Sequence, residues 1–330
     1  MQSQAILFTA VNEVQVDTVD IPEPGPGELL VRTHYSCISP GTELRCLSGR
    51  QAGFVSWPII PGYALVGEVV RGGVGTTTPP GSLVFCSGTS RASQARLWGG
   101  HVAYAVVAEE RTFGVPPGID PVAASLAKLA AIVYHGVRLA RPSLDDQVLV
   151  IGLGVIGQLA ARLYAITGAR VVAADVAEPR VHLARAAGIA AYTAQTDRAT
   201  GLREALPHGA DIVVDATGVP DVIPQALELV RPLPWGDDQI TGARYVVQGS
   251  YPGSFSIPYQ AAFMAEVSFL LPRDQQPRDL RSVRDLMQRG KLHVRDLVSA
   301  IRKPEQAAET YAELRDPTGR LLTAVFDWRA

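Results

Sequence analysis

Residues 148–157 read Val-Leu-Val-Ile-Gly-Leu-Gly-Val-Ile-Gly, and residues 171–175 read Val-Val-Ala-Ala-Asp. The first stretch predicts a buried strand, a glycine-rich turn and a helix, because helical spacing of apolar residues continues to Tyr164. Gly168 is expected to end that helix, and the second stretch then predicts a strand that ends in an acid. This order of elements is typical of the nucleotide-binding half of a Rossmann fold.

The glycines of the turn suit a bound pyrophosphate. Gly152 permits the tight turn, Gly154 lets the backbone approach the phosphates, and Gly157 lets the helix pack closely on the strand. The first helical residues, Val155 and Ile156, supply N–H groups at the positive end of the helix dipole. A strand–turn–helix that binds no ligand is the simpler alternative, because glycines also mark ordinary turns.

The acid at the end of the second strand predicts which dinucleotide binds. Asp175 lies 18 residues after Gly157, where a carboxylate can accept hydrogen bonds from both ribose hydroxyls. The same charge would repel a 2′-phosphate, so the sequence favours NAD over NADP as the cofactor. Arg180 follows closely and is expected to flank the adenosine.

Composition excludes several classes of protein. The 330 residues are 47% apolar and 19% charged, as in an ordinary globular protein with room for two domains. The net charge of −2 gives no reason to expect a nucleic-acid partner, and no apolar run approaches the ~20 residues of a membrane span. Residues 1–5 lack the features of a signal peptide. Three cysteines without a Cys-x-x-Cys pair are expected to be buried, inert thiols and fit a reducing cytoplasm.

The pattern of elements divides the chain into three parts. Short strand-like runs between prolines and glycines predict a β-rich domain over residues 1–120. Alternating strands and helices predict a parallel sheet with helices on both faces over residues 121–265. Residues 266–330 predict a return segment with two helices and a closing strand. The fold class is therefore α/β, with a Rossmann-type doubly wound sheet and a β-rich domain. Helices are expected over residues 123–131, 180–187, 222–230, 279–289 and 305–314.

This domain order resembles the medium-chain dehydrogenase/reductase family. Residues 61–70 read Pro-Gly-Tyr-Ala-Leu-Val-Gly-Glu-Val-Val, similar to the family's Pro-Gly-His-Glu-x-x-Gly-x-Val, and further similar segments lie at residues 99–104, 215–218, 290–292 and 307–311. The resemblance covers nearly the whole chain and implies that the β-rich domain is GroES-like. It implies that Ala216 and Thr217 lie beside the nicotinamide. Gly249 and Ser250, after the next strand, are expected to contact the same cofactor.

Within that family the chain is similar to the bacteriochlorophyllide dehydrogenases. The similarity lies at residues 38–43, 57–63, 262–266, 316–317 and 325–328. Those enzymes oxidise a hydroxyethyl side chain to acetyl, whereas related sequences act on sugars, cyclitols and antibiotic intermediates. The resemblance therefore leaves the substrate open.

The positions of the family's catalytic zinc ligands are changed in this chain. A Cys, the His of Gly-His-Glu and a later Cys or Glu correspond to Ser39, Tyr63 and Lys128. Hydroxyl, phenol and ammonium groups do not form an ordinary zinc site. The family's lobe of four cysteines is also missing, so we expect neither a catalytic nor a structural metal.

Alcohol oxidation still needs a group that handles the hydroxyl proton. Tyr63 is expected to be that group, with Lys128 lowering its pKa and Ser39 holding the substrate oxygen. The alternative places Tyr63 in the core and Lys128 in solvent. His101 is a weaker acid–base candidate. Thr42 and Glu43 stand where zinc enzymes of the family carry polar residues behind the metal and are expected to border the substrate pocket.

The sequence thus predicts NAD-dependent, zinc-independent oxidation of a secondary alcohol to a ketone, or the reverse. Its partners are expected to be a small-molecule substrate and a second copy of the chain in a homodimer. Quinone or enoyl reduction is a second hypothesis, although such reductases usually prefer NADPH. A catalytically silent NAD-binding protein is a third.

Overall fold

The computed structural model describes residues 1–51, 56–194, 199–236, 241–251, 253–316 and 318–329. The chain forms two compact units. Unit 1 comprises residues 1–129, 281–317 and 321–330, and unit 2 comprises residues 130–280 and 318–320. The boundaries expected at residues 120/121 and 265/266 stay a prediction, and each unit is described by itself.

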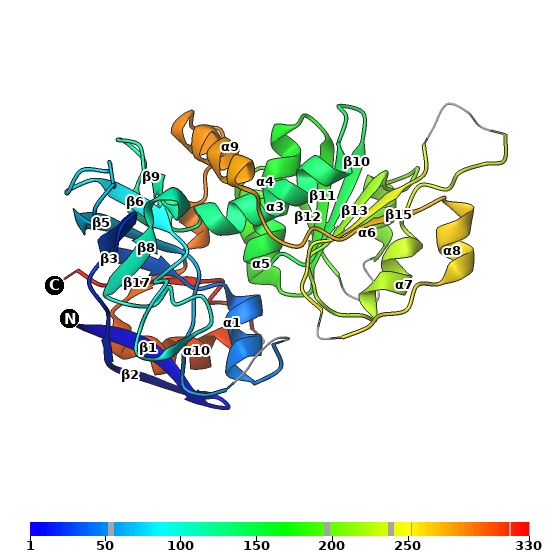
Figure 1. Ribbon diagram of the computed structural model, residues 1–330. Helices are drawn as coiled ribbons and strands as arrows, with labels where there is room; N and C mark the ends of the chain where they lie inside the picture. The colour runs from blue at the N-terminus through cyan, green and yellow to red at the C-terminus, as the bar shows by residue number, and fades with distance from the viewer. Residues whose placement is uncertain (52–55, 195–198, 237–240, 252, 317, 330) are drawn as a thin grey trace. The chain divides into compact units, whose positions relative to one another are not determined.

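Unit 2 contains one sheet whose described strands are all parallel, in the order β12-β11-β10-β13-β14-β15 (Figure 1). Its strands are β10 (Gln147–Ile151), β11 (Arg170–Asp175), β12 (Ala190–Thr193), β13 (Ile212–Asp215), β14 (Arg244–Val247) and β15 (Ser268–Leu270). The helices are α4 (Val155–Ile166), α5 (Glu178–Ala186), α6 (Ala199–Ala205), α7 (Val222–Leu227) and α8 (Tyr259–Met264). Two more helices, α3 (Ala127–Ala140) and α9 (Pro277–Gln288), cross the unit boundaries in the sequence. The predicted α/β class is confirmed.

Unit 1 contains two sheets. A four-stranded sheet has the order β2-β1-β4-β7, and a seven-stranded sheet has the order β16-β17-β3-β5-β6-β9 with β8 paired to β3. The strands are β1 (Gln2–Ala10), β2 (Glu13–Asp20), β3 (Glu28–Cys37), β4 (Ile59–Ile60), β5 (Leu65–Gly72), β6 (Leu83–Cys86), β7 (Ala95–Arg96), β8 (Tyr104–Ala108), β9 (Phe113–Gly114), β16 (Ala300–Arg302) and β17 (Ala324–Asp327). The α-helices are α1 (Pro40–Leu47), α2 (Pro121–Ala124) and α10 (Ala307–Leu314), and the short 3₁₀ turns are η1 (Glu109–Arg111), η2 (Arg295–Leu297) and η3 (Pro304–Gln306).

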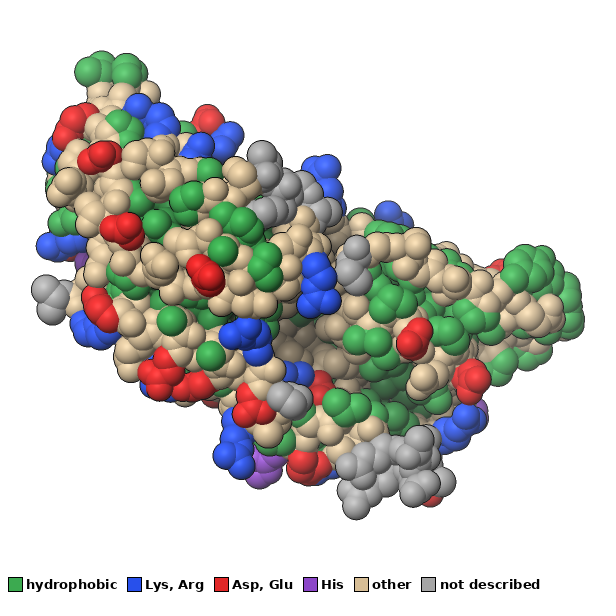
Figure 2. All heavy atoms as spheres, turned by 90° about the horizontal axis from the view of Figure 1, so that it is seen from below, with side chains coloured by type: hydrophobic (Ala, Val, Ile, Leu, Met, Phe, Trp, Pro, Cys, Tyr) green, Lys and Arg blue, Asp and Glu red, His purple; other side chains and the backbone are tan. Residues whose placement is uncertain are grey.

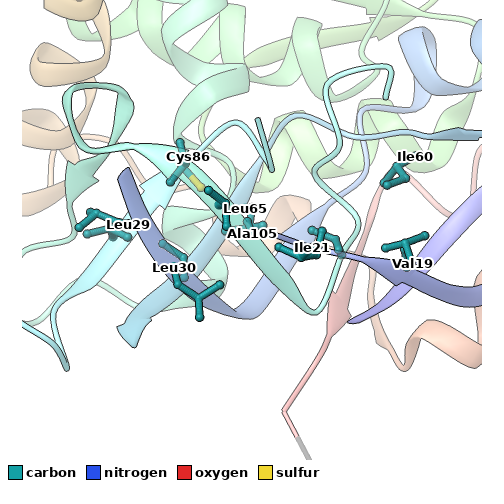
Figure 3. Packing of buried hydrophobic residues seen from close by; sticks show 14 of the residues in the cluster. Val19, Ile21, Leu29, Leu30, Ile60, Leu65, Cys86 and Ala105 are labelled. Carbon is teal, nitrogen blue, oxygen red and sulfur yellow. The ribbon is translucent and has the colours of Figure 1, made fainter. Parts of the chain in front are cut away.

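Apolar residues of the unit 1 strands form its main core. Leu29 and Leu30 of β3, Leu65 of β5, Cys86 of β6 and Ala105 of β8 are all buried in one cluster (Figure 3). A second cluster joins the two ends of the chain, because Phe8 packs edge to face on Tyr311 of α10 with ring centroids 5.0 Å apart. Helix α10 and strand β1, which lie about 300 residues apart in the sequence, therefore pack in the same unit.

Two expected helices differ from the structure. The helix expected over residues 123–131 is interrupted, since α2 ends at Ala124 and α3 begins at Ala127. The helix expected over residues 222–230 ends at Leu227, and Val230 forms an isolated β-bridge with Ala210. Helical periodicity alone does not reveal such ends, because tertiary pairing competes with the local pattern.

The described surface is mixed in charge. Both acidic and basic side chains are scattered over the face shown in Figure 2, in keeping with the net charge of −2. Within the described ranges, no helix combines the length and apolar character that crossing a membrane requires.

Candidate active site and dinucleotide-binding loop

The glycine turn after β10 has the geometry expected of a phosphate-binding loop. Gly152 has a φ of +85°, a conformation that residues with a Cβ rarely adopt. A Cβ on Gly157 would overlap the carbonyl oxygen of Gly152, so α4 packs here only with glycine. A Cβ on Gly154 would meet no atom within 4 Å, so space is open beside the loop backbone. Val155 and Ile156 form the first turn of α4, where helical N–H groups lack intrahelical acceptors.

Asp175 is fixed at the end of β11 beside this turn. Its Oδ2 accepts a hydrogen bond from the Leu153 N–H at 2.5 Å, and its Oδ1 accepts one from the Ala177 N–H at 2.8 Å. The Arg180 guanidinium lies 3.6 Å from Oδ2. Each carboxylate oxygen has a second lone pair, so the buried Asp175 can still accept from a ribose hydroxyl.

A second acid organises the ends of the neighbouring strands β13 and β14. Asp215 is fully buried and accepts hydrogen bonds from the Thr217 N–H at 2.9 Å, from the Tyr245 hydroxyl at 2.8 Å and from the Tyr251 hydroxyl. Burial and this carboxylate raise the pKa of both phenols. The Gly249 N–H donates to the Asp215 backbone oxygen at 2.7 Å. The sequence analysis did not single out Tyr245 or Tyr251, because isolated tyrosines carry no motif.

The residues expected to bind the cofactor therefore follow four strands that are adjacent in the sheet. They are the glycine turn after β10, Asp175 at the end of β11, Ala216 and Thr217 after β13, and Gly249 and Ser250 after β14. In open α/β sheets, ligands bind outside the carboxyl ends of the strands. The residues present fit a dinucleotide.

In unit 1 the structure brings together residues far apart in sequence. Tyr63 follows β4 and donates a hydrogen bond from its hydroxyl to Ser39 Oγ, which lies just before α1, at 2.5 Å. Thr42 Oγ1 in the first turn of α1 lies 3.4 Å from the same phenol. Tyr63 and Ser39 are nearly buried, with 8% and 4% of their surfaces exposed. Tyr63 is thus a buried aromatic residue whose hydroxyl is engaged with polar groups.

Glu43 and His101 lie behind this hydroxyl pair and are fully buried. Glu43 Oε1 accepts from the Ser39 N–H at 2.7 Å, and Oε2 accepts from His101 Nε2 at 2.9 Å and from the Tyr311 hydroxyl. His101 Nδ1 lies 2.8 Å from Ser36 Oγ, which also accepts the Trp328 indole N–H. Both ring nitrogens of His101 are therefore engaged, which suits a positioning role.

Lys128 lies in the first turn of α3 and is 7% exposed. The alternative that it points into solvent is therefore wrong. Its pairing with Tyr63 stays a prediction. The three cysteines are buried as expected, and burial raises the pKa of each thiol to about 12.

Sequence reasoning missed two neighbours of Tyr63. Arg45 lies one turn after Thr42 on α1, close enough for its charge to interact with an ionised Tyr63, although burial lowers its own pKa. Trp98 packs edge to face on Tyr63, with ring centroids 5.0 Å apart and planes at 84°. The spacing of Thr42 and Arg45 on one helix face was a usable signal for Arg45, whereas nothing in the sequence marks Trp98.

Comparison with known proteins agrees with this geometry. Residues 25–117 match the alcohol dehydrogenase GroES-like domain, and residues 155–266 match the zinc-binding dehydrogenase domain. The chain is 30% identical to a 2-desacetyl-2-hydroxyethyl bacteriochlorophyllide A dehydrogenase of Cereibacter sphaeroides, over 100% of this chain and 99% of that protein. The chain belongs to the medium-chain dehydrogenase/reductase family. It is an oxidoreductase of the alcohol dehydrogenase type, as the sequence predicts.

Other members of the family extend the comparison. An L-galactonate-5-dehydrogenase of Escherichia coli is 28% identical over 88% of this chain and 89% of that protein. The solved structure of an Escherichia coli alcohol dehydrogenase complexed with NADH covers 99% of both chains at a TM-score of 0.85 and 18% identity, which shows the shared fold.

The zinc that many members of the family carry does not fit the donor set of this chain. Ser39 and Tyr63 offer hydroxyl groups, hydrogen-bonded to each other, in place of the thiolate and imidazole groups that zinc prefers. The nearby imidazole and carboxylate of His101 and Glu43 are hydrogen-bonded to one another inside the core. Over the part of the chain that the structure describes, no group of three or more His, Cys, Asp or Glu side chains is placed to hold a metal ion.

Proposed function

We propose that this chain oxidises a secondary alcohol to a ketone, or reduces the ketone, with NAD and without zinc. The observation that carries this proposal is the hydrogen bond between the Tyr63 hydroxyl and Ser39 Oγ. These two residues occupy positions at which zinc-dependent relatives carry metal ligands. A phenol and a serine hydroxyl replace the metal by holding the substrate oxygen and moving its proton.

Different side chains of unit 1 are assigned to proton transfer and to binding of the substrate oxygen. In the oxidation direction the Tyr63 phenolate takes the proton from the alcohol oxygen. NAD would supply the hydride acceptor, and the glycine turn, Asp175 and Thr217 would hold it. Ser39 Oγ donates a hydrogen bond to the substrate oxygen and is held in place through its own N–H by Glu43. A nearby cation favours the phenolate, and both Arg45 and the buried Lys128 are candidates for that charge.

Asp175 supports NAD as the preferred dinucleotide. Its carboxylate is buried at the strand end next to the glycine turn and would repel a 2′-phosphate. The Arg180 guanidinium at 3.6 Å offsets part of that repulsion. Fluorescence titration should show tighter binding of NADH than of NADPH, and the opposite order would contradict this assignment.

Two substrate classes remain within the proposal. A hydroxyethyl group on a pigment ring is favoured by the relative named for bacteriochlorophyllide, which spans the whole chain. A sugar, cyclitol or natural-product alcohol is the second candidate, which the relative named for L-galactonate supports. Both are small molecules, and both reactions convert a secondary alcohol to a ketone.

The assembly and location are also proposals. We infer a homodimer, because β15 ends the six-stranded sheet and its outer edge pairs with no strand among the described residues. Light scattering that finds only monomer would contradict it. A cytoplasmic location is supported by three buried, unpaired thiols and is tested by fractionation of the source cells.

A panel of secondary alcohols tests the whole proposal. The enzyme should reduce NAD with at least one of them, elemental analysis should find less than one zinc per chain, and a chelator should leave the rate unchanged. NADH binding without turnover on any alcohol would favour a silent NAD-binding protein. Turnover of quinones or enones with NADPH would favour the reductase alternative. A stoichiometric zinc whose removal abolishes activity would overturn the roles given to Ser39 and Tyr63.

A further inference from the structure

Trp98 is an exposed aromatic residue in a backbone conformation that bulky residues rarely adopt. It lies between β7 and β8 with a φ of +74°, and 40% of its surface is exposed. Both features are unfavourable for tryptophan, since the left-handed region crowds the Cβ and apolar indole surface is left in water. Such outliers persist only where the surrounding structure imposes them, and they cluster at functional sites.

Backbone hydrogen bonds on both sides of Trp98 impose this conformation. The N–H groups of Leu97 and Gly99 donate to the same carbonyl oxygen, that of Ile60, at 3.0 and 3.2 Å. The His101 N–H donates to the Pro61 carbonyl at 3.1 Å. The indole therefore projects from a turn that is tied to the segment immediately before Tyr63. Its position relative to Tyr63 is set by the backbone rather than by a flexible loop.

The indole lies directly against the residue that we propose handles the proton. The rings of Trp98 and Tyr63 meet edge to face, a favourable arrangement for aromatic pairs, with centroids 5.0 Å apart. Only 8% of Tyr63 is exposed, whereas Trp98 keeps 40% of its surface free. The exposed part of Trp98 is therefore an aromatic surface next to the nearly buried Tyr63 that a ring can contact.

We propose that Trp98 determines substrate specificity by binding a flat, apolar ring that carries the secondary alcohol. This inference rests on the proposed function and favours an alcohol carried on a flat apolar ring over an acyclic polyol. A flat ring can stack on or pack edge to face against the indole and remove apolar surface of both from water. An acyclic polyol carries a hydroxyl on each carbon, and burying those hydroxyls against an indole leaves them without hydrogen-bond partners.

Replacement of Trp98 tests the inference with two alcohols of different shape. Trp98→Ala should lower kcat/KM for 1-(2-naphthyl)ethanol about tenfold, mainly through KM, because an aromatic contact is lost. The same variant should change kcat/KM for 2-butanol by less than about twofold, because that alcohol has no ring to bind. Trp98→Phe keeps an aromatic face and should recover most of the loss. Trp235→Ala, which removes an 83% exposed indole from unit 2, is the matched control and should change neither value.

A binding measurement separates this inference from the proposed function. Calorimetric titration of 2-acetylnaphthalene into enzyme saturated with NAD, a combination that cannot react, should give about tenfold weaker binding in Trp98→Ala. If the wild type oxidises no alcohol yet binds this ketone through Trp98, the proposed function fails and the ring-binding role stands. Equal losses for both alcohols, or ketone binding unchanged by the substitution, would overturn the inference. If Trp98→Ala does not fold, Trp98→Leu keeps apolar volume without a flat face and is judged by the same outcomes.

Discussion

Asp175 and Glu43 are both buried carboxylates at the centre of a candidate site, but their partners lie at very different distances along the chain. Asp175 accepts from N–H groups 2 and 22 residues away, within one strand–turn–helix unit. Glu43 accepts from groups 4, 58 and 268 residues away. The contacts that hold Asp175 are therefore local and made by the backbone, whereas the Tyr63 region is assembled from distant side chains. This difference predicts that substitutions in the two regions have separable effects.

The largest effect is expected at Tyr63. Tyr63→Phe removes the proposed proton carrier and should lower turnover by roughly 10²–10⁴-fold, while NADH binding in unit 2 stays unchanged. Steady-state rates and NADH fluorescence titration measure the two quantities. Tyr259→Phe, at an exposed position on α8, is the control. Normal turnover in Tyr63→Phe would show that Tyr63 does not carry the proton.

Glu43 should matter most for stability. Glu43→Ala leaves the His101 ring, the Tyr311 hydroxyl and the Ser39 N–H without their acceptor in the core, so the free energy of unfolding should fall by about 3–5 kcal/mol. Urea denaturation measures it. Glu68→Ala breaks the partly exposed ion pair with Arg32 and should cost at most about 1 kcal/mol. If the free energy of unfolding falls equally in Glu43→Ala and Glu68→Ala, the buried hydrogen bonds of Glu43 contribute no more to stability than a partly exposed ion pair.

Asp175 should control the choice between NAD and NADP without affecting proton transfer at Tyr63. Asp175→Ser removes the charge that repels a 2′-phosphate and should narrow the preference for NADH over NADPH by roughly 10–100-fold. Dissociation constants for both dinucleotides give this ratio, and the exposed Asp145→Ser serves as the control. A preference that does not move would assign the discrimination to other residues of the nucleotide site.

The smallest expected effect is a shift in the pH–rate profile, which identifies whether Arg45 or Lys128 is the cation that acts on Tyr63. A positive neighbour favours the phenolate, so its removal raises the pKa of Tyr63 and shifts the rising limb of the oxidation pH–rate profile to higher pH, by about one unit. Arg45→Met and Lys128→Met are compared by the same profile. A shift in only one variant names the cation. No shift in either would mean that neither charge acts on Tyr63.

The sequence predicted the dinucleotide region better than the Tyr63 region for a physical reason. Gly152 has a φ that residues with a Cβ rarely adopt, and a Cβ on Gly157 would clash with the Gly152 carbonyl oxygen, so the spacing of these glycines is visible in the chain itself. Ser39 and Tyr63 were found only because the resemblance marked two positions, and their contact depends on how β3, β4 and α1 pack. Trp98 and Tyr311 were missed, since each acts through a neighbour that only the folded chain supplies, whereas Arg45 was missed although its spacing from Thr42 could have marked it.

The pairing of β17 with β3 has a consequence for how the protein is made. Trp328 donates to Ser36, 292 residues earlier, and Val325 of β17 pairs with Cys37 of β3. During synthesis residues 35–37 of β3 wait without their partner until β17 has left the ribosome, although residues 28–32 on the same edge pair with β8 and the sheet of unit 2 can form earlier. An open strand edge invites pairing with other chains, so loss of the last residues should produce aggregation of nascent protein as well as inactivity.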